Sequence, residues 1–184
     1  MNVTTTPLEG LLILEPKVFT DDRGYFFESY NKQVLGANAG YNTAFVQDNQ
    51  ARSVKNVLRG LHYQNLPLPQ AKLIRVLEGS IWDVAVDIRK HSKTYKQWFG
   101  IELSAENKLQ LLIPHGFAHG YAVLSDTSEV FYKCDNFYNK PAEGGIFYAD
   151  PEIAVDWKIN LADAIISGKD MKQPMFKDAW NTFE

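Results

Sequence analysis

Short runs of alternating or β-branched and aromatic residues recur along this 184-residue chain, separated by residues that favour turns. The runs are LLILEPKVF, NTAFVQ, AKLIRVLEG, IWDVAVDI, KLQLLIP, HGYAVL, EVFYKC and GGIFYA. LEGS at 77–80 and PHG at 114–116 put Gly and Pro where strands should reverse. Many short strands at this spacing are typical of an antiparallel barrel or sandwich, so the pattern predicts an all-β fold.

Two segments favour short helices instead of strands. One is NKQVLGANAG in the N-terminal third, and the other is LADAIISGKDMKQPMF, which follows the last clear strand and is expected to form a C-terminal helical cap. No repeat, low-complexity tract or linker marks a boundary inside the chain. Since a chain of this length buries most of its apolar surface in one core, we expect residues 1–184 to form a single domain.

The composition is that of an ordinary globular protein, with 45% hydrophobic and 22% charged residues. A net charge of −3 gives no global attraction to nucleic acid or to an anionic membrane. No apolar run is long enough to span a bilayer, and the N-terminal MNVTTTPLEG does not read as a secretion signal, so a cytoplasmic protein is expected. Cys134 is the only cysteine, which excludes an intrachain disulfide and favours a small buried side chain.

The segment RGLHYQ at 59–64 places a cation, a glycine and a histidine close together in a predicted strand. Alternation along the strand puts His62 and Gln64 on one face and Leu61 and Tyr63 on the other. A polar face inside a barrel is a binding surface. Taken alone, however, His62 is better explained as a structural or surface histidine.

The segment PHGFAHG at 114–120 has the strand-turn-strand pattern of a small cupin-type barrel. Metal-binding cupins combine such a turn with an earlier His-x-His and a glutamate. Here the His-x-His position reads His62-Tyr63-Gln64, and Lys72 occupies the position of the glutamate. An ammonium group repels a divalent cation, so a catalytic metal is not expected. A histidine, a lysine and one or two arginines suit an anionic substrate and acid–base chemistry.

Ordered motifs from about residue 5 to the C-terminal region resemble those of the dTDP-4-dehydrorhamnose 3,5-epimerase family. They are Asp21-x-Arg23-Gly24-x-Phe26-x-Glu28, Gln47-Asp48-Asn49, RGLHYQ at 59–64, KLIRV at 72–76, GSIWDVAVDIR at 79–89, TYKQW at 94–98, LSAEN at 103–107, IPHGFAHGYAVLSD at 113–126, VFYKCDNFY at 130–138 and DPEIAVDW at 150–157. The resemblance implies a cupin-type barrel or jelly roll that needs no cofactor and epimerises a dTDP-4-keto-6-deoxy sugar at C3 and C5.

The resemblance also implies a role for each of four catalytic residues. His62 would remove the protons next to the C4 ketone, and Asp170 would orient the imidazole and stabilise its charged form. Tyr132 would return a proton on the opposite face of the sugar ring. Lys72 would stabilise the enolate that forms on proton loss. Without the family, Asp170 is better explained as a surface or helix-capping carboxylate, and Tyr132 as a core aromatic.

The same resemblance assigns substrate binding to a larger set of polar residues, of which Tyr138 would stack on the thymine ring. The set is Arg23, Glu28, Gln47, Asn49, Arg59, His119, Tyr138, Glu143 and Lys169. The chain departs from the family pattern at Gln50 and Ala51, where His and Ser are common, at Lys96, where glycine is common, and at Tyr121, where phenylalanine is usual. The first departure bears on substrate positioning, and the others resemble turn or packing substitutions.

Three alternatives remain open from the sequence. The first is an epimerase acting at C3 only, or a ketoisomerase, on a related dTDP-4-keto-6-deoxy sugar. The second is a non-catalytic cupin that binds a nucleotide sugar. The third, a metal-dependent cupin oxygenase, is disfavoured by Gln64 and Lys72. Since the family forms dimers in which strands cross between subunits, the resemblance further implies a homodimer whose sites share residues of both chains.

Overall fold

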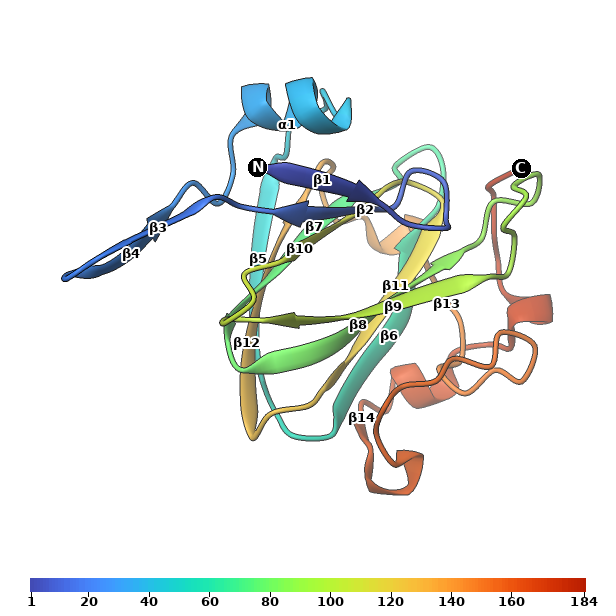
Figure 1. The fold of residues 1–184 in the computed structure, drawn as a ribbon. Coiled ribbons are helices and arrows are strands. Elements are labelled where there is room, and N and C mark those ends of the chain that lie inside the picture. The colour runs from blue at the N-terminus through green and yellow to red at the C-terminus, as the bar shows by residue number, and fades with distance from the viewer.

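Antiparallel strands are the main secondary structure of the protein, seen in a computed structural model that describes residues 1–184 (Figure 1). One six-stranded sheet has the order β1 (Asn2–Thr5), β2 (Leu12–Glu15), β10 (Gln110–Ile113), β7 (Lys72–Glu78), β12 (Thr127–Cys134) and β5 (Gln47–Val54). The second has the order β13 (Glu143–Gly145), β6 (Val57–Gln64), β11 (Phe117–Val123), β8 (Ser80–Asp87) and β9 (Trp98–Ser104), with β14 (Ile165–Ile166) pairing in parallel with β6. The two sheets face each other, which confirms the predicted all-β, cupin-type barrel.

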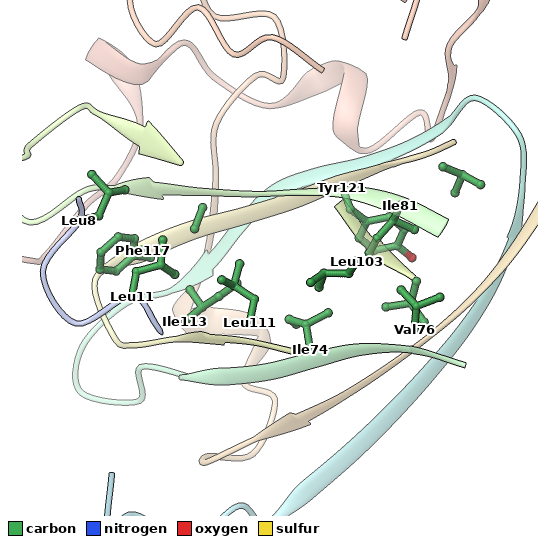
Figure 2. Close-up of a cluster of buried hydrophobic side chains, with 13 residues drawn as sticks. Leu8, Leu11, Ile74, Val76, Ile81, Leu103, Leu111, Ile113, Phe117 and Tyr121 are labelled. Carbon is green, nitrogen blue, oxygen red and sulfur yellow. The ribbon is translucent and has the colours of Figure 1, made fainter. Parts of the chain in front are cut away.

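Alternation along the strands fills the space between the sheets with apolar side chains. A cluster of 13 buried residues lies there, including Ile74 of β7, Leu111 of β10 and Phe117 of β11 (Figure 2). On β8, Ile81 and Ala85 belong to this cluster, and Asp83 between them shares their face. A sheet residue and its second neighbour point to the same side, so the alternating pattern of the sequence accounts directly for this core.

The outer face of the second sheet is covered by the C-terminal third of the chain. Trp157, Ile153 and Phe176 pack there against residues such as Leu61 and Ala118, in a second cluster of 13 buried residues. Trp157 is almost completely buried and its indole Nε1 donates to the carbonyl of Tyr148 at 2.8 Å. Both faces of this sheet are therefore buried along much of its length, and every residue of its central strand β11 is buried.

The helix predicted in the N-terminal third is confirmed as α1 (Lys32–Ala39). The side chain of Asn31 accepts hydrogen bonds from the N–H groups of Gln33 and Val34, and Gly40 ends the helix in the left-handed conformation with φ of 68°. These are the preferred residues for the two ends of a helix. No helix of the structure is long and apolar enough to cross a membrane.

The C-terminal region contains short helices, but not one continuous helical cap. Three 3-10 helices, Leu161–Asp163, Asp170–Lys172 and Phe176–Asp178, are separated by β14 and by loop. The β-branched pair Ile165–Ile166 joins β6 as a strand, and Gly168 and Pro174 disfavour a helix running through them. Another 3-10 helix, Lys140–Ala142, precedes β13.

Some strand positions differ from the pattern-based prediction. The segment 42–46 lies before β5, which begins only at Gln47, so the strand predicted at NTAFVQ was wrong for most of its length. Strand β9 was missed. A separate hairpin of β3 (Val18–Asp21) and β4 (Gly24–Phe27) projects away from the barrel (Figure 1), and no strand of the two sheets pairs with it.

Candidate active site

A cavity of about 530 Å³ opens between the two sheets. Seven residues predicted from the sequence line it: Arg59, His62, Lys72, His119, Tyr132, Lys169 and Asp170. An adjoining cavity of about 190 Å³ shares His62, Lys72 and Tyr132 and adds the predicted residues Gln47, Asn49, Tyr138 and Glu143. The fold therefore brings together eleven of the thirteen residues that the sequence suggested, from strands of both sheets and from the C-terminal segment.

The imidazole of His62 is paired with the carboxylate of Asp170, and Nε2 lies 2.6 Å from Oδ1. Asp170 stands at the start of a 3-10 helix, and its own N–H donates to Ser167 Oγ at 3.0 Å. Burial raises the pKa of Asp170, but hydrogen bonds from His62, the Gly60 N–H and Ser167 more than offset it and hold this pKa below its usual value. The carboxylate is ionised at neutral pH and holds the ring with Nε2 towards itself, which leaves Nδ1 as the other ring nitrogen.

Arg59 and His62 both line the cavity, although strict alternation would place them on opposite faces. The pairing of β6 with β11 shifts register between His119 and Tyr121, opposite this segment. Gly60 lies in the shift with φ of 130°, and a Cβ there would lie 2.5 Å from Gly120 Cα. Only glycine fits this close backbone approach, and the shift lets the Arg59 and His62 side chains share one cavity.

Lys72 and Tyr132 face His62 from the opposite sheet. Both belong to neighbouring strands, β7 and β12, whose register sets Lys72 opposite Cys134 and Tyr132 opposite Ile74. Burial lowers the pKa of Lys72, partly offset by Cys134, Asp83 and Glu143. Burial also raises the pKa of Tyr132 to about 12, so its phenol keeps the proton at neutral pH. The cavity thus holds a histidine–carboxylate pair on one wall and a lysine amine and a protonated phenol on the other.

A second histidine–carboxylate pair lies in the wall of the cavity and was missed from the sequence. Asp83 of β8 is fully buried, and both of its carboxylate oxygens lie 3.0 Å from His119 Nε2. Burial lowers the pKa of His119, although Asp83 acts in the opposite direction. The sequence carried a signal for Asp83, because an aspartate in the apolar strand IWDVAVDI needs a partner inside the fold.

The predicted binding residues of the adjoining cavity form a connected group. Lys169 Nζ lies 2.6 Å from Glu143 Oε1, and the hydroxyl of Tyr138 donates to Glu143 Oε2 at 3.3 Å. On the other side, Gln47 Nε2 donates to Asn49 Oδ1 at 3.1 Å, while Gln47 Oε1 accepts from the N–H of Tyr138 at 2.9 Å. Tyr138 is about half exposed. An aromatic ring with this exposure offers a flat face at the rim of the site.

Arg23 and Glu28 are the two predicted residues that do not join the cavity of their own chain. Arg23 is strongly exposed on the projecting hairpin and pairs with Asp21, which raises the pKa of the guanidinium. Glu28 follows β4 and accepts a hydrogen bond from Asn31 Nδ2 at 3.0 Å. The hairpin carries their part of the chain away from the barrel (Figure 1).

Gln64 stands where metal-binding cupins have the second histidine of His-x-His. Its side chain hydrogen-bonds to backbone groups of the same chain. Its amide nitrogen donates to the carbonyls of Leu68 and Phe137, at 2.6 and 3.2 Å, and its Oε1 accepts from the N–H of Asn139 at 2.7 Å. These bonds anchor the segment that leads to Tyr138. The side chain therefore acts as a structural clamp beside His62.

A barrel of the cupin type with an acid–base set of histidine, aspartate, lysine and tyrosine in its cavity defines an enzyme class that moves protons. The comparisons with known proteins make this class specific. The family model for dTDP-4-dehydrorhamnose 3,5-epimerase matches residues 5–178, and the chain belongs to this family.

Individual relatives resemble the chain over nearly its whole length. The dTDP-4-dehydrorhamnose 3,5-epimerase of Shigella flexneri is 51% identical over 179 residues, which cover 97% of this chain and 98% of the relative. The crystal structure of the dTDP-4-dehydrorhamnose 3,5-epimerase of Elizabethkingia anophelis superposes with a TM-score of 0.93 at 53% identity and covers 97% of both chains. That of the dTDP-6-deoxy-D-glucose-3,5-epimerase of Legionella pneumophila, in complex with dTDP-4-keto-L-rhamnose, gives 0.92 at 45% identity, covering 96% of this chain and 93% of the other.

Proposed function

We propose that this protein epimerises dTDP-4-dehydro-6-deoxy-D-glucose at C3 and C5 and so forms dTDP-4-dehydro-L-rhamnose for dTDP-L-rhamnose biosynthesis. The observation that carries the proposal is that His62 and Tyr132 lie on opposing sheets across one cavity. Inverting a carbon centre requires removal of a proton from one face of the sugar and return of a proton to the other. The chemistry uses only side chains of the chain.

His62 is the proposed base. Since Nε2 is held by Asp170, Nδ1 takes the proton next to the C4 ketone, and the ring becomes an imidazolium stabilised by the carboxylate. The carbanion delocalises onto the ketone oxygen as an enolate. Lys72, half-buried in the same wall as Tyr132, is proposed to stabilise that oxygen with its ammonium group.

Tyr132 is the proposed acid. Its pKa of about 12 keeps the phenol protonated until the enolate forms, and the phenol then donates its proton to carbon on the face opposite to His62. His62 then releases its proton to solvent and Tyr132 regains one from it, and the same two steps occur at the second carbon, since both carbons flank the ketone. Arg59 and His119 are proposed to hold the substrate, with Gln47, Asn49, Tyr138, Glu143 and Lys169 around the nucleotide end.

The experiment that tests this function is deuterium exchange during turnover. The protein is incubated with dTDP-4-dehydro-6-deoxy-D-glucose in heavy water and the ring positions are followed by NMR. Deuterium at both C3 and C5 with formation of the L-sugar supports the proposal. Exchange at C3 alone would establish the narrower epimerase, a moved ketone would establish a ketoisomerase, and absence of exchange with retained binding would indicate a non-catalytic binder.

The matched variants are His62→Ala and His91→Ala. His91 is exposed and remote from the cavity, so its replacement should leave exchange unchanged. His62→Ala should abolish exchange at both carbons while the circular dichroism spectrum stays that of the wild type. Full exchange by His62→Ala would remove His62 as the base.

We also propose that the chain works as a homodimer in which Arg23 and Glu28 reach the partner's cavity. Two features support this: neither residue joins the cavity of its own chain, and the hairpin exposes Phe19, Tyr25 and Phe26 by 54, 62 and 70%. Such a surface is typical of an interface between copies.

Mixed dimers test this arrangement. His62→Ala and Arg23→Ala chains are each inactive in the proposed scheme, but a dimer of one of each has one site with wild-type His62 and Arg23. An equal mixture after subunit exchange should recover about a quarter of wild-type activity, because half of the dimers are mixed and each has one intact site. Recovery of no activity would place Arg23 in its own chain's site, and full activity of the Arg23→Ala homodimer would place it outside catalysis.

Two broader expectations accompany this function. We propose that residues 1–184 act as one domain, because β14 and Asp170 of the C-terminal segment bind β6 and complete the cavity. We also propose a cytoplasmic location, which is supported by the single buried cysteine, Cys134.

A further inference from the structure

The hydroxyl of Tyr121 is the only polar side-chain atom in the buried cluster of 13 residues between the sheets. Figure 2 draws this oxygen at the end of the cluster where Val76, Ile81 and Leu103 lie. Tyr121 is 4% exposed, and its hydroxyl has no hydrogen-bond partner in the protein. A buried hydroxyl without a partner destabilises the folded chain, while the ring alone would fill the same space.

The hydroxyl lies where the apolar cluster meets the active-site cavity. Tyr121 lines that cavity, and its neighbour across the β6–β11 pair is Arg59. Its ring also packs near His119, at 6.3 Å between ring centroids. Ser53 Oγ of β5 is close enough to act on the Tyr121 hydroxyl and lower its pKa, but it makes its hydrogen bonds with Arg59, whose Nε and Nη2 donate to it at 3.2 and 3.1 Å.

The charges around Tyr121 point to the kind of group that would use this donor. Arg59 is a cation whose Nη1 makes no bond to the protein, so the same corner of the cavity offers a guanidinium N–H and a phenolic O–H. Two such donors suit an anionic oxygen. Burial raises the pKa of Tyr121, which keeps the phenol a donor in the working pH range.

We propose that the Tyr121 hydroxyl donates a hydrogen bond to a diphosphate oxygen of the bound nucleotide sugar, next to Arg59. This inference rests on the proposed function, because it takes the ligand to be a nucleoside-diphosphate sugar. It makes Tyr121 a substrate-binding residue rather than a packing substitution.

The variant that isolates the hydroxyl is Tyr121→Phe, with dTDP as the probe and calorimetric titration as the assay. Loss of a hydrogen bond to a charged oxygen should weaken dTDP binding roughly ten-fold or more. The melting temperature of the ligand-free protein should stay the same or rise, because the variant removes an unpartnered buried hydroxyl. A purely structural role of the Tyr121 hydroxyl would not produce a variant that binds dTDP more weakly and is as stable as the wild type.

The matched control is Tyr41→Phe. Tyr41 lines neither cavity, and its hydroxyl donates to Asp135 Oδ2 at 2.8 Å. This control should lower the melting temperature and leave dTDP affinity unchanged, the reverse of the effect at Tyr121.

Two outcomes overturn the inference. If Tyr121→Phe binds dTDP as tightly as the wild type does, the hydroxyl does not contact the diphosphate. This holds even if KM for the sugar nucleotide rises, because the contact would then be to the sugar. A wild-type protein that does not bind dTDP sinks the proposed function together with this inference. Wild-type binding without a difference at Tyr121 leaves the proposed function standing.

Discussion

Replacing Asp170 with Asn tests the pairing of the base with its carboxylate while preserving the size of the side chain. The asparagine oxygen could still accept from His62 Nε2, but its NH₂ group can equally turn to Nε2 and donate to it. In that arrangement the ring proton moves to Nδ1, and the nitrogen that faces the substrate no longer accepts a proton. The variant also removes the negative charge that stabilises the imidazolium.

The expected magnitude follows from the geometry. The Nε2 to Oδ1 distance is 2.6 Å, and the Asp170 side chain is only 5% exposed, so solvent screens the interaction little. A hydrogen bond to a charged group contributes about 1.5–3 kcal/mol, and each 1.36 kcal/mol of barrier changes a rate ten-fold. Since the wrong tautomer adds to this loss, we expect kcat to fall by roughly 100-fold or more, with little change in KM because Asp170 stabilises charge that develops only during reaction.

The assay is steady-state turnover of dTDP-4-dehydro-6-deoxy-D-glucose at neutral pH, with deuterium exchange at C3 and C5 measured in parallel. The matched control is Asp163→Asn in the preceding 3-10 helix, where the carboxylate is exposed and accepts only from Asn160 Nδ2 at 2.9 Å. This control should retain wild-type kcat. Asp170→Asn with kcat within two-fold of wild type, or with a rise in KM alone, would refute the orienting role.

Other variants test the acid, the core and the pH dependence. Tyr132→Phe should reduce net inversion by about 100-fold while His62 still exchanges deuterium into the sugar; loss of both activities would contradict separate acid and base roles. Leu111→Ala should lower the free energy of unfolding by about 3 kcal/mol in urea denaturation, whereas Leu161→Ala on the surface should change it by less than about 1 kcal/mol, because Leu111 is fully buried. Burial raises the pKa of Asp135, but hydrogen bonds from His115, the Ala71 N–H and Tyr41 lower it below its usual value. The stability that Asp135 adds is therefore present above about pH 4 and is lost as the pH falls through the lowered pKa, so the melting temperatures of wild type and Asp135→Asn should converge in acid; a gap that stays constant with pH would contradict this.

The local sequence pattern accounts for those parts of the fold whose secondary structure is determined by residues close together in the chain. Alternating apolar residues predicted the strands around Ile74 and Leu111, and Asn31 with Gly40 bounds the one α-helix. The pattern failed at 42–46 and for the C-terminal cap, where pairing with β6 drew Ile165 and Ile166 into a strand. Such tertiary pairing overrides local propensity because a short isolated helix is marginal in water, whereas the edge of β6 pairs with the backbone of Ile165 and Ile166.

The sequence by itself determined the class of fold, the face of β6 that carries His62, and the family to which the motifs point. Only the tertiary structure decided which groups meet. His62 and Asp170 are 108 positions apart, and no local pattern links them. Asp83 gains its partner His119 through the pairing of β8 with β11, and Tyr121 keeps its hydroxyl without a partner beside the cavity. Arg23 and Glu28, in turn, lie outside the cavity because their hairpin leaves the barrel. The physical reason is that hydrophobic periodicity specifies which face of a strand is buried, whereas contacts between distant strands depend on register and sheet packing.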